Sequence, residues 1–299
     1  MPITPFACLG RLSWLLALAC GECQSSPVSE PADPSTGLVP SLSKGSGHEA
    51  LGPWEELAPG VWWAVAEPDA VNLVLVVGAE RALLVDTGSS PAQGRTVRAA
   101  ADDVSGVPLE VVVVTHAHDD HLLGLPAFAD LVTVGHEDVP GPNRPMVLAV
   151  AFDLGGRRVE VAHLGRGHTG GDLVVVVPDA DLVVVGDLVE SAAPPSLGPD
   201  SFLQEWPVTV DGVIGLMTGS TRAVPGHGDP VDRTYVYEQR GRLAAIAGEV
   251  RRLAESGVSA ADAAARGDWA YPVETLAPGL ETAFAQLGPV VPRRTLPLA

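Results

Sequence analysis

Lysine and cysteine are nearly missing from this chain of 299 residues. Its single lysine is Lys44, and its three cysteines, Cys8, Cys20 and Cys23, all precede residue 24. The rest of the chain therefore has no thiol, and it can form no internal disulfide bond. Any metal ligands in that part must be nitrogen and oxygen donors.

Positive charge is also scarce. The chain has 18 basic and 37 acidic residues, which gives a formal net charge of -19. Such a charge repels the phosphate backbone on which nucleic-acid affinity depends, so we expect no nucleic-acid partner. The arginines are scattered and form no polybasic patch for an anionic membrane surface. No protein partner is evident from the composition.

The first residues have the pattern of an export signal. Arg11 is followed by an apolar run over residues 12–20, which is too short to span a bilayer and is typical of a signal-peptide core. We expect a signal over residues 1–23 and export to a bacterial periplasm or cell envelope. The letters LALAC resemble a lipobox ending at Cys20, so lipid attachment at Cys20 and ordinary signal cleavage remain alternatives.

A flexible tether is predicted for residues 24–50, because this segment is rich in Ser, Pro and Gly and has no apolar period. From there to residue 299 we expect one domain. Short Val- and Leu-rich runs predict eight strands, within residues 60–67, 72–78, 82–88, 109–118, 130–135, 157–165, 172–179 and 181–187. Helices are predicted over residues 92–102, 121–129, 201–218 and 233–256, with one short helix after them.

Several of the predicted strands are nearly continuous in Val and Leu instead of alternating apolar with polar residues. This pattern is typical of strands that are covered on both faces. We therefore predict an α/β fold in which two sheets lie between layers of helices.

The stretch VVVVTHAHDDHLLG, residues 111–124, places three histidines and two aspartates directly after an apolar strand. The loop beyond the carboxyl end of a strand is the usual place for ligands in α/β sheets. His116 and His118 lie two residues apart, so in an extended segment they point to the same side and can grip one ion. Asp120 and His121 follow where the chain begins to coil, and they turn toward a second position.

Further metal-ligating residues lie downstream, at strand ends or in glycine-rich turns. They are His168 in GRGHTGGD, Asp187 in VVVGDLVE and His227 in VPGHGD. Side chains in such places can reach inward, so we predict that they complete a metal centre with the first motif.

With Asp86 in LLVDTG, these motifs resemble in chain order those of the metallo-β-lactamase-fold hydrolase superfamily, over about residues 72–228. The resemblance implies a four-layer αββα sandwich of two mixed sheets and two metal ions. His116, His118 and His168 would hold one ion, whereas Asp120, His121 and His227 would hold the other. Asp187 would bridge the two ions, and Asp86 would organise the loop without binding metal.

Asp187 also bears on the kind of hydrolase. Metallo-β-lactamases proper carry Cys or Ser in the equivalent region, whereas glyoxalase II and lactonases have Asp, so the chain resembles the second group. We expect a dinuclear zinc hydrolase, with Fe or Mn as other metals, whose metal-bridging hydroxide attacks a carbonyl of a small-molecule substrate. The carbonyl is that of an ester, thioester, lactone or amide, and catalytic roles fall to Asp120 and Asp86.

Three alternatives stay open at this point. One is a mononuclear iron oxidoreductase of the persulfide dioxygenase type, which would use His116, His168 and Asp187. Another is a β-lactamase, which Asp187 disfavours. The third is a relay protein that binds metal without turnover. The substrate itself is not apparent from the sequence, because pocket walls come from loops that carry no motif.

Overall fold

The computed structural model describes residues 49–288. The predicted signal over residues 1–23, which includes Cys20 with its two alternatives, and the tether up to residue 48 lie outside the described residues. Ala50, the last residue of the predicted tether, already pairs with Glu67. Within residues 49–288, no helix combines the length and the apolar character that crossing a bilayer requires.

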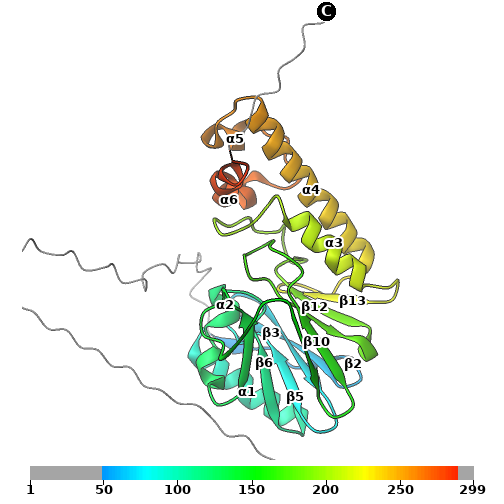
Figure 1. The fold of residues 1–299 in the computed structure, drawn as a ribbon. Helices are drawn as coiled ribbons and strands as arrows, with labels where there is room; N and C mark the ends of the chain where they lie inside the picture. The colour runs from blue at the N-terminus through cyan, green and yellow to red at the C-terminus, as the bar shows by residue number, and fades with distance from the viewer. Residues whose placement is uncertain (1–48, 289–299) are drawn as a thin grey trace, which may run out of the picture. The chain divides into compact units, whose positions relative to one another are not determined.

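Two β-sheets form the centre of the fold (Figure 1). The first sheet has eight strands in the order β1-β3-β4-β5-β6-β7-β8, with β2 also paired to β3, and the second has five in the order β13-β12-β11-β10-β9. The strands of the first sheet are β1 (Ala50–Leu51), β2 (Glu55–Ala58), β3 (Val61–Glu67), β4 (Val71–Val77), β5 (Ala82–Val85), β6 (Leu109–Val113), β7 (Val132–His136) and β8 (Arg144–Met146). Those of the second are β9 (Ala149–Asp153), β10 (Arg158–Ala162), β11 (Val174–Val177), β12 (Leu182–Gly186) and β13 (Arg222–Pro225).

Both sheets are mixed, and helices cover their outer faces. In the first sheet β5, β6, β7 and β8 run parallel, and in the second sheet β12 and β13 do. The α-helices are α1 (Pro91–Ser105), α2 (Asp119–Leu122), α3 (Trp206–Leu216), α4 (Arg233–Glu255), α5 (Ala260–Arg266) and α6 (Val273–Ala285). Two short 3-10 helices, η1 (Leu125–Phe128) and η2 (Pro178–Ala180), complete the elements.

The valine runs explain the layers. Along β6, Val111 and Val113 join the core between the two sheets, whereas Val112 joins the core between the first sheet and α1. Along β12, Val184 faces the first sheet, and Val183 packs in the core shared with α3 and α4. Because alternate residues of a strand point to opposite faces, continuous apolar runs bury both faces. The predicted αββα sandwich of two mixed sheets flanked by helices is confirmed.

The helix predictions were less accurate than the fold class. The predicted helix over residues 121–129 is interrupted at Leu123 and Gly124, and it forms the two short pieces α2 and η1. Gly94 of α1 passes so close to Gly124 that a side chain at either position would collide with backbone. Two helices follow α4 instead of one. Strands β1, β2, β8, β9 and β13 were missed, and all of them except β9 have only two to four residues.

Candidate metal centre

The predicted metal ligands converge at one edge of the sandwich. The histidine motif directly follows β6, and Asp86 directly follows β5, its parallel neighbour. On the second sheet, Asp187 directly follows β12 and His227 lies just beyond β13, again a parallel pair. Parallel strands bring their carboxyl ends to the same edge, which is why residues far apart in sequence meet here.

The first half-site consists of His116, His118 and His168 together with Asp187. One ligand atom from each lies within 4.8 Å of those of the other three. His118 Nδ1 and His168 Nε2 are 2.9 Å apart, and His168 Nε2 lies 3.4 Å from Asp187 Oδ2. His116 Nε2 is 3.8 Å from the same oxygen. These separations match donor atoms that surround one cation at bond lengths of about 2 Å.

The second half-site consists of Asp120, His121 and His227, whose ligand atoms also lie within 4.8 Å of one another. His227 Nε2 is 3.3 Å from Asp120 Oδ2, and His121 Nε2 is 3.7 Å from it. Asp187 adjoins this group as well, because its Oδ1 lies 3.2 Å from His121 Nε2 and its Oδ2 lies 3.5 Å from His227 Nε2. Asp187 therefore lies between the two half-sites.

Asp86 holds the ring of His121 without entering either half-site. Its Oδ2 accepts from His121 Nδ1 at 2.8 Å and from the Thr115 hydroxyl at 2.9 Å, and its Oδ1 accepts from the Thr115 amide. Since the Thr115 hydroxyl proton is used in this way, its oxygen accepts from His116 Nδ1 at 3.0 Å. Both rings thereby direct Nε2 at the centre, and each would bind an ion through that atom.

Two other rings are oriented in the same manner. His118 donates from Nε2 to Asp200 Oδ2 at 2.9 Å, which leaves Nδ1 for the centre. His227 donates from Nδ1 to the carbonyl of Ala70 at 3.2 Å. Hydrogen bonds of this kind set the tautomer and the ring angle of metal-binding histidines.

The residues fit a metal because their buried polar atoms have no other partner. Among the described residues, His116 Nε2, His121 Nε2 and Asp187 Oδ1 are buried without a hydrogen bond. Leaving several such atoms unpaired costs about 1–3 kcal/mol each, and a bound cation removes that cost. The cluster of histidine and aspartate side chains is a metal-binding site.

The electrostatics of the half-sites differ. Burial, with neighbouring histidines, lowers the pKa of His116 well below its usual range and that of His168 to about 4. These rings are neutral at pH 7 and ready to bind a cation. In the second half-site burial acts in the same direction, but Asp187 and Asp120 outweigh it and raise the pKa of His227 to about 11. Burial also opposes protonation of His121, but Asp187, Asp120 and Asp86 raise the pKa of that ring well above its usual range. Both rings therefore carry a proton that an incoming ion must displace.

Asn72 on β4 connects the His227 loop to the first sheet. Its side-chain amide donates to the carbonyls of Pro225 and Gly228, at 2.9 and 2.6 Å. Its backbone amide donates to Gly226, whose missing side chain is required because a Cβ there would lie 1.7 Å from Asp187 Oδ1. These contacts place His227 beside Asp187.

Three residues of this region were not predicted from the sequence: Asn72, Glu190 and Asp200. Glu190 is 6% exposed, and its carboxyl group lies within 4.8 Å of ligand atoms of Asp187 and His227. The one sequence feature that could have indicated Glu190 is its position directly after the apolar pair at 188–189. No sequence motif surrounds Asp200, and it lies 82 residues from His118 in the chain, so the sequence does not indicate their contact. Asp119 belongs to none of the ligand groups.

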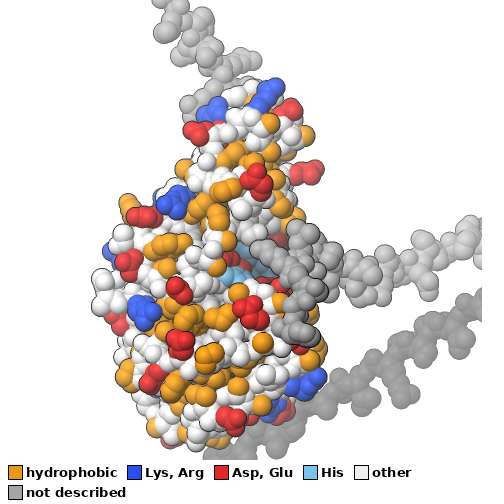
Figure 2. All heavy atoms as spheres, turned by 180° about the vertical axis from the view of Figure 1, so that it is seen from behind, with side chains coloured by type: hydrophobic (Ala, Val, Ile, Leu, Met, Phe, Trp, Pro, Cys, Tyr) orange, Lys and Arg blue, Asp and Glu red, His pale blue; other side chains and the backbone are white. Residues whose placement is uncertain are grey.

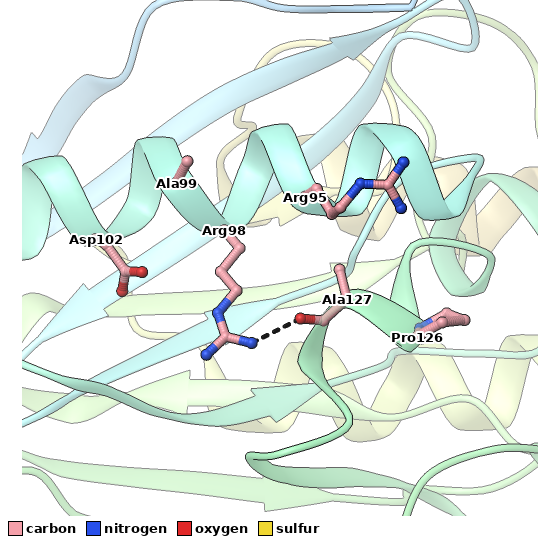
Figure 3. Close-up of a pocket in the computed structure, with 6 residues that line it drawn as sticks. All are labelled: Arg95, Arg98, Ala99, Asp102, Pro126 and Ala127. Carbon is pink, nitrogen blue, oxygen red and sulfur yellow. Dashed lines mark hydrogen bonds between the residues drawn. The ribbon is translucent and has the colours of Figure 1, made fainter.

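The centre is partly open to solvent. Histidine side chains reach the surface on the face drawn in Figure 2, next to acidic side chains. The side chains of Asp120 and His118 are 21% and 23% exposed. A separate surface pocket of about 440 Å³ lies between α1 and η1 and is lined by none of the cluster residues (Figure 3). Its Arg98 donates to the carbonyl of Ala127 and to Asp130.

Fold and site together define an αββα protein with a histidine and aspartate metal centre at a sheet edge. Residues 66–137 match the family model described as the metallo-β-lactamase superfamily. The type 2 metallo-β-lactamase of Bacillus cereus is 29% identical over 135 residues, which cover 41% of this chain and 53% of that protein. That of Bacteroides fragilis is 25% identical over 171 residues, which cover 53% of this chain and 69% of that protein.

Solved structures show the same fold. A metallo-β-lactamase from Pontibacter korlensis superposes with a TM-score of 0.59 at 24% identity, over 64% of this chain and 98% of that one. One from Erythrobacter litoralis gives 0.56 at 21% identity, over 64% and 95%. The family model, these relatives and the shared fold together support the resemblance to the metallo-β-lactamase fold superfamily that the sequence motifs indicated. It spans about half the length of the Bacillus relatives that it matches.

Proposed function

We propose that the protein is a hydrolase that holds two zinc ions and directs water at the carbonyl group of a small ester, thioester, lactone or amide. The observation that carries this proposal is the position of Asp187, which lies within 4 Å of ring nitrogens of both half-sites. A carboxylate in that position can bridge two ions. Bound divalent ions supply a reactive water at neutral pH and polarise the substrate carbonyl.

Within the chain, Asp120 is the residue best placed to handle the water. Its side chain is 21% exposed, so a substrate and a water molecule can approach it. Burial opposes its ionisation, but His121 and His227 lower the pKa of its carboxyl group, so it is charged at neutral pH. It can therefore accept a hydrogen bond from the attacking water and orient it. Asp86 is buried behind His121 and acts only by holding that ring.

The second half-site also bears on the alternatives. A single-iron oxidoreductase would use His116, His168 and Asp187, and it would leave Asp120, His121 and His227 without a role. Their convergence favours a two-ion hydrolase. The relatives named as metallo-β-lactamases make a β-lactam one of the substrates to test, although this chain carries Asp187 in a region where such enzymes have Cys or Ser.

Metal removal tests the proposal directly. We expect a panel of lactones, thioesters, esters and β-lactams to contain at least one substrate that the purified protein hydrolyses. A chelator should abolish this turnover, and added zinc should restore it, because the chain offers no thiol here and no other nucleophile in the cluster. Metal analysis should find two ions per chain. One iron per chain with oxygen consumption, or full metal loading without turnover on any substrate, would contradict the proposal.

Binding of the second ion should depend strongly on pH. The pKa of the His227 ring is about 11 in the ion-free folded protein and 6.5 in the unfolded chain. The folded protein therefore keeps the ring proton up to about pH 11, whereas the unfolded chain loses it near pH 6.5. That proton stabilises the ion-free fold below pH 6.5, and the contribution is lost as the pH rises through 11. Because the ion displaces the proton of His227 and also that of His121, whose pKa is raised well above its usual range, its apparent affinity should rise at least about tenfold per pH unit, or at least about 100-fold from pH 6 to 8.

Calorimetric titration in two buffers of different ionisation enthalpy counts the protons released. We expect at least one proton for the second ion, because the pKa values of both His227 and His121 are raised. The first ion should show a weaker pH dependence, because two of its three rings, His116 and His168, are already neutral. Binding of both ions without proton release would show that His227 is not protonated in the ion-free protein.

A further inference from the structure

Glu190 is a buried acid beside the second half-site that the superfamily resemblance did not include. It lies three residues after Asp187, in the turn that follows β12, and it is 6% exposed. One carboxylate oxygen of Glu190, one of Asp187 and a ring nitrogen of His227 all lie within 4.8 Å of one another. His227 and Asp187 are thus shared between this group and the half-sites.

The backbone of Glu190 is held in place by α4 on one side and by the His227 loop on the other. Its amide donates to Gln239 Oε1 at 3.1 Å, and its carbonyl accepts from the Tyr235 hydroxyl at 2.8 Å. The next residue, Ser191, donates its amide to the carbonyl of His227 at 3.1 Å. Gln239, itself 2% exposed, also donates to Leu188. These bonds fix the backbone from which the Glu190 side chain extends, before any ligand binds.

Charge makes this placement costly unless a cation or a proton compensates it. The carboxyl groups of Glu190 and Asp187 adjoin each other in a buried site, and no arginine in residues 49–288 forms an ion pair with either one. Two adjacent buried carboxylates repel, and each loses its hydration. A second observation also indicates a cation at this place. His121 is 0% exposed, and its Nε2, which faces Asp187, has no hydrogen bond among the described residues.

We propose that Glu190 is an additional ligand of the ion in the second half-site. This inference rests on the proposed metal centre and extends it. The second ion then has carboxylate oxygens from Asp120, Asp187 and Glu190 beside the imidazoles of His121 and His227. Carboxylate donors suit Mn²⁺ better than imidazole donors do, so the second half-site should tolerate Mn²⁺, whereas the histidine-rich first half-site favours zinc.

The charge of the centre changes accordingly. Two divalent ions bring four positive charges, and three carboxylates leave about one of them before a hydroxide enters. With a hydroxide the centre is neutral. A neutral centre attracts an anionic substrate less than one without Glu190 would.

Titration of E190Q with Zn²⁺ and with Mn²⁺, against a chromophoric chelator, tests the inference. Glutamine keeps the shape and removes the charge. We expect the affinity for the second ion to fall about tenfold or more, with a larger loss for Mn²⁺ than for Zn²⁺ and an unchanged first ion. The matched control is D119N, which removes one acid from the same edge at a partly exposed position outside every ligand group. It should change neither affinity by more than about twofold.

The outcomes separate this inference from the proposed function. If the unaltered protein binds no more than one ion, the two-ion proposal fails first. If it binds two and E190Q binds both as tightly, Glu190 only donates a hydrogen bond to Asp187, as an amide also can, and the inference is wrong. Should E190Q not fold, E190D provides the second variant. It keeps the charge but withdraws the carboxylate by one methylene, and it should lose second-ion affinity if Glu190 is a ligand.

Discussion

D187N is expected to retain at most one ion and to lose about three orders of magnitude in turnover. Asp187 Oδ2 lies 3.4 Å from His168 Nε2 and 3.5 Å from His227 Nε2, so one carboxylate serves both half-sites. Asparagine keeps the shape, but it removes the negative charge that offsets two cations and offers only one acceptor oxygen. Loss of a hydrogen-bonded partner of a ligand already costs about 10–100-fold in affinity, and loss of a ligand costs more.

Metal content after dialysis and turnover on the best substrate of the panel measure this effect together. D119N is again the control. It makes the same Asp to Asn change next to Asp120, but Asp119 belongs to neither half-site. Two tightly bound ions in D187N would show that Asp187 does not bridge. Two ions with lost turnover would assign it a part in the reaction and not in binding.

D86A is expected to lose about 3 kcal/mol or more of unfolding free energy and to weaken the second ion about 10–100-fold. Asp86 is 1% exposed, and its carboxylate accepts three hydrogen bonds, from the amide and hydroxyl of Thr115 and from His121 Nδ1. Alanine leaves all three buried donors unpaired. Asp86 also has φ of 64°, a left-handed conformation that costs alanine more than it costs Asp or Asn.

D86N separates the two causes. Asparagine tolerates the left-handed backbone, but in either orientation its amide nitrogen meets a donor from Thr115 or His121. We therefore expect an intermediate loss of stability and a loss of metal affinity close to that of D86A. Denaturant unfolding with and without a chelator provides the measurement. D130N, which removes an exposed ion pair with Arg98, should cost less than about 1 kcal/mol. Equal effects of D86A and D130N would contradict the role given to Asp86.

The fold class could be predicted because it depends on a pattern that is continuous in sequence. Valine runs such as that of β6 bury alternate residues in two different cores, which only a strand between two layers can do. The break between α2 and η1 could not be predicted, because it depends on the close approach of Gly94 to Gly124 in the folded protein. Likewise, β13 has only four residues, RAVP, and it is a strand because β12 pairs with it.

The histidine and aspartate ligands were predictable because metal chemistry restricts the side chains that can serve, and because these side chains lie at strand ends. Residues that only position the ligands are not restricted to a few side-chain types, so the sequence does not reveal them. Asp200 reaches His118 across 82 residues of sequence, and Asn72 reaches Gly228 across 156. Their roles arise from contacts between distant loops. Glu190 is an intermediate case, since its acid follows the predicted ligand Asp187 by three residues but its burial depends on Gln239 and Tyr235 of α4.

Each half-site draws its side chains from both sheets. His116 and His118 follow β6 of the first sheet, whereas Asp187 follows β12 of the second. A metal ion held by such a set is a cross-link that joins the two halves of the sandwich at their open edge. Neither half of the chain, produced alone, would contain a complete set of ligands. Bound metal should therefore stabilise the packing of the two sheets against each other. Removal of the ions should destabilise the domain along that edge, and not only the loops that contact the ions.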